Sequence, residues 1–178
     1  VSPAKLVVDP SGEFLITANL DGNDLTMINK LTDGRRIAID AGPRDIVISE
    51  DGSRMMVIAW KRGESESAIF TLKTDFTNRP WPAIEADKTK RMRGGFTQAQ
   101  LGADGQLYVL DRLGGKLRVF NPETRDEVKS CAVGDEPMSF VLRQVDNDKL
   151  AGLSNKTKAR LKLEAVIERV KLQSKPFT

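Results

Sequence analysis

The chain has 178 residues, of which 39% are hydrophobic and 30% charged, a balance typical of a globular domain rather than of a disordered or fibrous chain. Its net charge of +3 is only mildly basic, and no stretch approaches the roughly 20 apolar residues that a membrane-spanning helix needs. The sequence contains no histidine, which excludes a Ser-His-Asp triad and every metal site with a histidine ligand.

A strand, a tight turn and a returning strand recur three times along the chain, over residues 4–18, 45–59 and 99–110. Each turn is Ser-Gly or Asp-Gly, and its glycine supplies the positive φ that a tight hairpin requires. The interval between the first two turns matches a four-stranded propeller blade of about 40–50 residues. The next interval is longer, which predicts an insertion. The turn glycines are Gly12, Gly52 and Gly105.

The remainder of each repeat also recurs. After the second strand comes a polar turn, a third strand, another turn and a short fourth strand, and the repeat closes with a glycine and a nearby proline. Four strands per unit, with turn signals every 8–12 residues, indicate an all-β protein rather than βαβ units. We expect third strands at 25–29, 67–72 and 116–120, and fourth strands at 36–39 and 127–133.

The last segment follows the repeat less closely. Residues 138–142 read as a first strand and 149–153 as a second. Residues 160–172 fit both periods, because apolar residues alternate as in a strand and also fall on one helix face. We favour strands there, since a fourth blade needs them. The predicted organisation is one domain over 1–178, with blades at 3–42, 43–87, 88–136 and 137–178 and an insertion at about 73–93.

These repeats resemble the YVTN-type family of β-propeller repeats. Repeats of this family are similar in form to WD40 repeats and also occur in surface-layer and lactonase-like propellers. The similarity is carried by residues 9–19, 49–57, 104–111 and 115–124, and it extends over about 3–137. It implies an all-β β-propeller of about four four-stranded blades, either a closed small ring or a partial arc of a larger propeller. It also implies a periplasmic, cell-surface or extracellular setting, with which the missing initiator Met agrees, although trimming of a longer chain would explain that as well.

A partial arc has a physical consequence. Its terminal blades would expose apolar faces and strand edges, which aggregate unless another subunit covers them. We therefore expect a protein partner or a larger complex, or a homo-oligomer if the arc is incomplete. Peripheral membrane association stays open as an alternative.

Candidate catalytic or metal-binding residues are few. Asp33, Asp51 and Asp104 precede turn glycines, where aspartate bonds its own backbone. Asn19 and Asp111 end second strands at equivalent places, and a lactonase-like enzyme would hold a metal near there. Two such residues do not make a site, so we expect no catalytic residue, no metal and no cofactor.

Exposed aromatic and basic residues are the better candidates for a contact surface. Trp81 lies between two prolines in the expected insertion, and tryptophan is enriched at binding hot spots. Trp60 ends a strand beside two basic residues. A short basic cluster lies at the end of the expected insertion and could contact phosphates or anionic lipid, although such runs usually form solvated faces. The predicted partner contacts are Trp81, Arg79, Trp60, Lys88, Lys90, Arg91 and Arg93.

The sequence therefore predicts a non-catalytic protein-interaction or structural subunit, built on β-propeller repeats and docking onto a larger assembly. The alternative is a metal-dependent enzyme of the lactonase or hydrolase type. Nucleic-acid binding ranks last, because the basic segments lack regularly interleaved aromatic residues.

Overall fold

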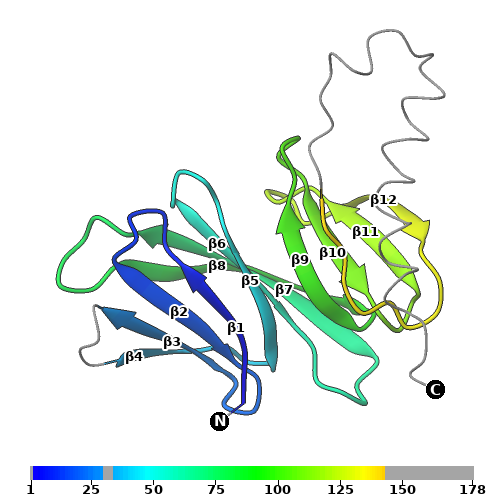
Figure 1. Cartoon of the computed structure of the whole chain (residues 1–178), viewed down its shortest axis with the longest axis horizontal. Helices are drawn as coiled ribbons and strands as arrows, with labels where there is room; N and C mark the ends of the chain where they lie inside the picture. Colours follow the sequence, from blue (N-terminus) through cyan, green and yellow to red (C-terminus); the bar gives the residue numbers. More distant parts are fainter. Residues whose placement is uncertain (1, 30–33, 143–178) are drawn as a thin grey trace, which may run out of the picture.

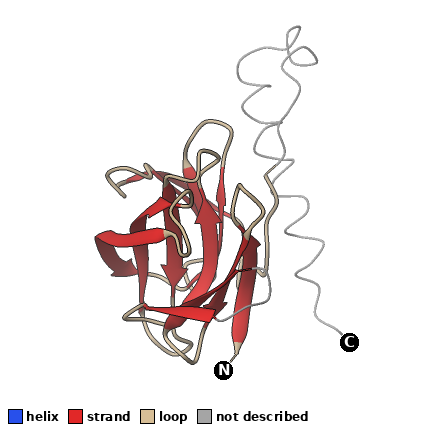
Figure 2. Ribbon diagram, turned by 90° about the vertical axis from the view of Figure 1, so that its left-hand side faces the viewer, coloured by secondary structure: helices blue, strands red, loops and turns tan. Residues whose placement is uncertain are grey.

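The computed structural model of the chain describes residues 2–29 and 34–142. They form twelve strands in three antiparallel four-stranded sheets, with no helix among these residues (Figure 1 and Figure 2). The predicted all-β class is confirmed. The strands expected at 149–153 and 160–172 lie outside the described residues.

Within each sheet the strands follow chain order, so that every sheet is a simple meander. The first contains β1 (Pro3–Val8), β2 (Phe14–Asn19), β3 (Asp24–Asn29) and β4 (Gly34–Ala38). The second contains β5 (Pro43–Ile48), β6 (Arg54–Ala59), β7 (Glu66–Asp75) and β8 (Ala83–Arg93). The third contains β9 (Phe96–Leu101), β10 (Leu107–Asp111), β11 (Lys116–Phe120) and β12 (Glu127–Ala132).

The first hairpin of each sheet turns where the sequence predicts. Gly12, Gly52 and Gly105 have φ of 75°, 69° and 73°, which side chains with a Cβ rarely adopt. The buried Asp9 fixes the turn of the first sheet, because one of its carboxylate oxygens accepts a bond of 2.7 Å from the Phe14 amide. Burial raises the pKa of Asp9, but the hydroxyl and amide bonds to it prevail and hold that pKa below its usual value.

The core lies between the sheets, which pack face to face in succession. Side chains alternate between the two faces of each strand, so that one face of β2 is fully buried. The first interface joins Phe14, Ile16, Leu25 and Met27 to Ile46, Met55, Val57, Phe70 and Leu72. The second joins Met56, Ile58 and Ile69 to Phe96, Ala99, Leu107, Val109 and Phe120.

The expected insertion at 73–93 is a lengthened hairpin. β7 and β8 pair from Glu66↔Arg93 to Asp75↔Ala83, so that residues 83–93 form the fourth strand of the second sheet. The expected blade boundary between 87 and 88 falls inside β8. This strand could not be recognised from the sequence because it is exposed along most of its length. An exposed outer strand needs no alternation of apolar residues.

Residues 138–142 were expected to form a first strand, but they form no strand. They lie alongside β9 instead. The Phe140 amide donates to Oε1 of Gln98 at 2.9 Å, and the Leu142 amide donates to Oε1 of Gln100 at 2.9 Å. Nε2 of Gln98 donates in turn to the Phe140 carbonyl at 3.1 Å. Side chains of β9 therefore hold this segment along the edge of the third sheet.

None of the residues described forms a helix that could span a membrane.

Candidate functional site

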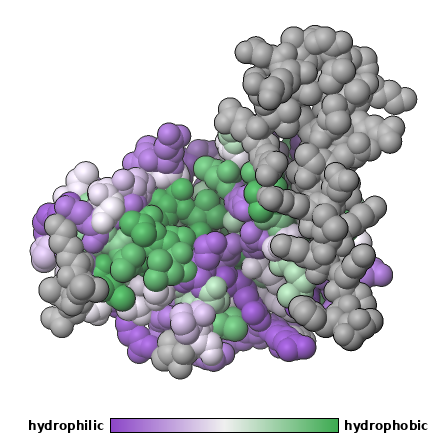
Figure 3. All heavy atoms as spheres, viewed as in Figure 1, coloured by the Kyte–Doolittle hydropathy of each residue, from purple (hydrophilic) through white to green (hydrophobic). Residues whose placement is uncertain are grey.

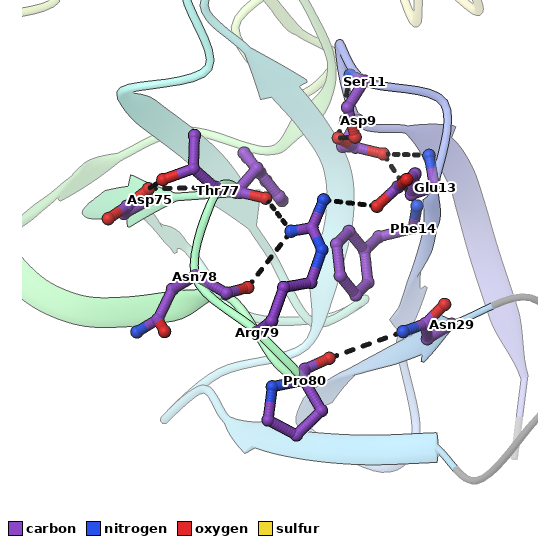
Figure 4. Close-up of polar contacts among 11 residues, drawn as sticks. Asp9, Ser11, Glu13, Phe14, Asn29, Asp75, Thr77, Asn78, Arg79 and Pro80 are labelled. Atoms are coloured by element: carbon purple, nitrogen blue, oxygen red, sulfur yellow. Dashed lines mark hydrogen bonds and ion pairs between the residues drawn. The ribbon is translucent and has the colours of Figure 1, made fainter.

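The β7–β8 turn carries two of the predicted contact residues, and it folds over the first sheet (Figure 4). The Arg79 guanidinium forms an ion pair with Glu13 and donates to the Phe76 carbonyl at 2.5 Å. It also lies 5.4 Å from the centre of the Phe14 ring. The Trp81 ring lies 6.4 Å from the same ring. Both residues therefore join the second sheet to the first, while Arg79 stays exposed at the surface.

We expect Trp81→Ala to lower the free energy of unfolding by about 1–2 kcal/mol, because a half-buried aromatic contact with Phe14 is lost. Urea unfolding followed by circular dichroism measures the change. Trp81→Phe keeps a ring at this position and should lose less than half as much. An unchanged stability in Trp81→Ala would mean that the ring is held for a partner rather than for the core.

Trp60 is a core residue. Its ring is buried, its Nε1 donates to the Glu64 carbonyl at 2.8 Å, and the Arg44 guanidinium lies 5.1 Å from the ring centre. A ring enclosed in this way offers little surface to a partner. The basic residues beside it are exposed.

The basic cluster lies on β8, where the pleat sends neighbouring side chains to opposite sides. Lys90 forms an ion pair of 2.6 Å with Asp126 of the third sheet. Arg91 forms one of 3.0 Å with Asp40, which follows the first sheet. Lys88 and Arg93 are exposed on the same strand. The cluster is therefore divided between two sides of the strand and does not form one basic patch.

Asn19 and Asp111 occupy equivalent positions, as predicted, since Asn19 pairs with Pro3 and Asp111 with Phe96 at the start of each sheet. Nδ2 of Asn19 donates to Asp24 at 2.6 Å and to Thr26 at 2.8 Å. The amide thus fixes the β2–β3 hairpin.

Asp111 is engaged in the same manner. Its Oδ1 accepts bonds of 2.9 Å from the amides of Gly95 and Gly114, and its Oδ2 lies 3.3 Å from Nη1 of Arg118. Among the described residues, no group of three or more His, Cys, Asp or Glu side chains could hold a metal ion. The side chains at these strand ends therefore bond to the turns and strands around them.

An open groove of about 560 Å³ lies among the turns of the first two sheets. The acidic residues in this groove form hydrogen bonds within their own turns. The bond from the Ser49 hydroxyl, followed by those from the amide and hydroxyl of Ser53, lowers the pKa of Asp51 to about 2. Asp75 accepts from the amide and hydroxyl of Thr77, and these bonds lower its pKa too. The groove is lined by Pro10, Ser11, Asp51, Gly52, Ser53, Thr74, Asp75, Phe76, Thr77 and Arg79.

A line of polar contacts joins the neighbouring strands β1, β5 and β9. Asp45 is buried on β5, where its Oδ1 lies 3.2 Å from Nζ of Lys5 on β1. Its Oδ2 accepts a 2.9 Å bond from the Ala99 amide on β9. Gln98 holds the position on β9 that Asp45 holds on β5, and it bonds Phe140 in the same way. Asp45 and Gln98 therefore each reach forward to a later segment of the chain, Asp45 to β9 and Gln98 to residues 138–142.

One face of the first sheet is open. Leu6 and Val8 point outward from β1 with 54% and 51% of their surface exposed. The strand pairing places Leu6 at the position of Ile46 in the second sheet and of Ala99 in the third. Those two residues are only 2% and 4% exposed, because the preceding sheet covers them. Figure 3 shows the resulting apolar area over the first sheet.

Comparison with solved structures identifies the arrangement of the sheets. The chain is similar to a periplasmic gluconolactonase of Pseudomonas aeruginosa, with a TM-score of 0.64 and 18% identity, over 79% of this chain and 44% of that one. It is similar to a putative 6-phosphogluconolactonase of Bacteroides fragilis, with a TM-score of 0.62 and 18% identity, over 77% and 42%. It also matches the Cps50 (Swd1) β-propeller domain of Myceliophteria thermophila, with a TM-score of 0.56 and 15% identity, over 71% and 41%.

The chain has a β-propeller fold. Its three described sheets are blades, which we number 1 to 3 along the chain, and the predicted fold class is confirmed. The chain spans less than half the length of these propellers. No family model and no curated protein matches it, so the resemblance to YVTN-type repeats stays a prediction. At this level of identity the matches establish the fold alone, and they include lactonase-like proteins as well as another propeller domain.

Sequence reasoning missed the residues that distinguish this arc most clearly. The open face of blade 1 follows the same apolar alternation as the covered faces of blades 2 and 3, so Leu6 and Val8 read as ordinary core. Asp45 gave no signal, because an aspartate at the start of a strand is common and its partners are distant in sequence. Only the strand register shows that Lys5, Asp45 and Gln98 share one position.

Proposed function

We propose that the chain is a non-catalytic structural or protein-interaction module that docks onto a larger assembly, using the open face of blade 1. The observation that carries this proposal is the exposure of Leu6 at a position that the preceding blade buries in blades 2 and 3, together with the exposure of Val8 beside it. Covering each half-exposed apolar side chain contributes on the order of 1 kcal/mol. A surface built like a blade interface is therefore a surface suited to binding protein.

The setting that we propose is periplasmic or at the cell surface, and the repeats are proposed to be of the YVTN type. The location is supported by the similarity to a periplasmic gluconolactonase, and the repeat type by the turn sequences of blades 1 to 3. The outer edge at the exposed Arg79 and the half-buried Trp81 is proposed as a second contact area, with Lys88 and Arg93 on β8. Trp60, Lys90 and Arg91 are less suited to that role, because the first is buried and the other two are ion-paired within the chain.

The substitution Leu6→Cys tests the proposal, in a Cys131→Ser background that leaves the new cysteine as the sole thiol. We expect maleimide to label Cys at position 6 at least ten times more slowly in extracts of the source cells than in the dilute purified chain, because a bound partner shields the face. Glu85→Cys, on the exposed β8, is the matched control and should react equally fast in both.

Equal labelling at position 6 in the extract and in the dilute chain would contradict the proposal. Metal analysis of the purified protein addresses the enzyme alternative, since a stoichiometric divalent cation that also supports lactone hydrolysis would favour it. Neither a cation nor hydrolysis is expected from a structural module.

A further inference from the structure

We infer that the outer junction between blades 2 and 3 binds a phosphate group, held by Arg125 and Lys88. Arg125 lies in the turn between β11 and β12 of blade 3. This turn packs across three strands of blade 2, where it contacts Arg54 on β6, Thr71 on β7 and Lys90 on β8. The open face of blade 1 takes no part in this junction, so the inference is independent of the proposed function.

The turn between β11 and β12 fixes the position of Arg125. The Asn121 side chain accepts bonds of 2.8 and 3.1 Å from the amides of Glu123 and Thr124. The Arg125 amide donates to the Asn121 carbonyl at 2.7 Å, and Arg125 itself has a left-handed φ of 60°. The residue is only 6% exposed. The guanidinium is therefore held in place before any ligand arrives, which lowers the entropic cost of binding one.

One edge of the Arg125 guanidinium is free. Nη1 donates to Oγ1 of Thr71 at 3.4 Å, whereas Nε and Nη2 bond to none of the described residues, and no described carboxylate forms an ion pair with the group. Neither nitrogen is among the fully enclosed polar atoms that lack a partner, so both reach solvent. Nε–H and Nη2–H form a planar fork that can bind two oxygens of a carboxylate or a phosphate at once.

Lys88 brings a second cation to the same place. It pairs with Thr71 across β7 and β8, and side chains of directly paired residues lie on the same face of a sheet. Thr71 is the residue that the Arg125 guanidinium contacts. Lys88 is exposed and forms no ion pair within the part of the chain that the structure describes. Its ammonium group is therefore available beside the free edge of Arg125.

Two acids at this junction are engaged with other cations. Asp126 lies 2.6 Å from Nζ of Lys90, and Glu123 forms an ion pair with Arg54. The pKa of Asp126 is lowered first by the hydrogen bond from Lys90, and the charge of Arg125 contributes least to that shift. These carboxylates therefore do not neutralise Arg125, although they lie in the same turn.

The charge of the site favours phosphate over a carboxylate. Arg125 and Lys88 carry two positive charges, and a phosphate monoester carries about −1.5 to −2 at pH 7. A carboxylate carries a single charge and would occupy the Arg125 fork alone. Asp87 precedes Lys88 at the bulge of β8, where it is exposed and repels an anion. Because of this repulsion and the open position of Lys88, we expect a dissociation constant on the order of 1 mM.

A titration with inorganic phosphate, followed by NMR of the Arg125 Nε–H group and of nearby amides, tests the inference. These signals should shift with phosphate and not with chloride at equal ionic strength. Arg125→Lys keeps the charge but lacks the fork, and it should weaken binding about tenfold. Lys88→Gln should weaken binding about threefold, and Asp87→Asn should strengthen it about twofold. Lys116→Gln, at an exposed lysine of β11, is the matched control and should bind like the wild type.

Equal shifts with chloride would overturn the inference, as would wild-type binding in Lys88→Gln. Acetate that binds as tightly as phosphate would also overturn it, because the site would then recognise a single charge. Should Arg125→Lys fail to fold, the opposite effects of Lys88→Gln and Asp87→Asn still decide, since both residues are exposed. Phenyl phosphate separates the sources of the group: tighter binding than that of inorganic phosphate would support an esterified phosphate as the ligand, and weaker binding would support free phosphate.

Discussion

Replacing Phe14 by alanine is expected to lower the free energy of unfolding by about 3–5 kcal/mol. Phe14 is fully buried at the centre of the interface between blades 1 and 2. Its ring lies 6.3 Å from Phe76 and 6.4 Å from Trp81, and the Arg79 guanidinium covers it at 5.4 Å. The substitution would thus leave a cavity and also remove the surface on which the β7–β8 turn rests.

Urea unfolding, followed by circular dichroism, provides the measurement. Phe14→Leu retains most of the apolar volume and should cost about 1–1.5 kcal/mol. Val128→Ala is the matched control at an exposed apolar position and should change stability by no more than about 0.5 kcal/mol. A loss below 1 kcal/mol in Phe14→Ala would show that blade 1 does not depend on this interface. Combining Phe14→Ala with Trp81→Ala should cost less than the sum of the single losses, because both remove the same contact.

The second large effect is expected at Asp45, where Asp45→Ala should lower the free energy of unfolding by about 2–4 kcal/mol. The greater part of this loss comes from the Ala99 amide, a buried donor left without its acceptor. The Ile46 amide loses the same carboxylate at 2.8 Å. The ion pair with Lys5 contributes less, because that lysine is 40% exposed and solvent screens its charge.

The control for charge alone is Asp45→Asn, which keeps an oxygen for the Ala99 amide and should lose less than half as much stability. Asp40→Ala removes an exposed carboxylate that is paired with Arg91 and should have no resolvable effect. Hydrogen exchange at the Ala99 amide provides a local measurement, since this amide should exchange faster in Asp45→Ala. The amides of β10 and β11 should respond only to the lower free energy of unfolding of the whole protein. Equal stability losses in Asp45→Asn and Asp45→Ala would mean that charge, rather than the acceptor, is what matters.

Local signals in the sequence were sufficient for most of the fold. The hairpins at Gly12, Gly52 and Gly105 could be predicted, because a turn of this kind depends on a few adjacent residues. The strand at 116–120 was placed without error, since its alternation is clear and its two flanking turns are marked. β8 was missed for the opposite reason: it is an exposed outer strand, held by pairing with β7 rather than by apolar contacts of its own.

The candidate site was less predictable, because it depends on what lies beside each blade. Trp81 was identified as a contact residue, and it does make a contact, but with Phe14 of the same chain. Leu6 and Ile46 occupy the same place in the repeat, yet one is exposed and the other is buried. No property of the repeat itself separates them. The difference comes from the presence or absence of a preceding blade in the described structure.

The contacts between successive blades also bear on how such a chain can evolve. Asp45 and Gln98 both reach forward to a backbone amide, of Ala99 and of Phe140, rather than to a particular side chain. A backbone amide is present whatever residue stands there, short of proline. A gene that gains or loses a whole repeat with a hydrogen-bond acceptor at this position therefore keeps this junction without a second, compensating mutation. In repeat proteins, stability is close to a sum over units and their neighbours, so each such event changes it by a limited step. Copy number is then a quantity that selection can adjust one blade at a time.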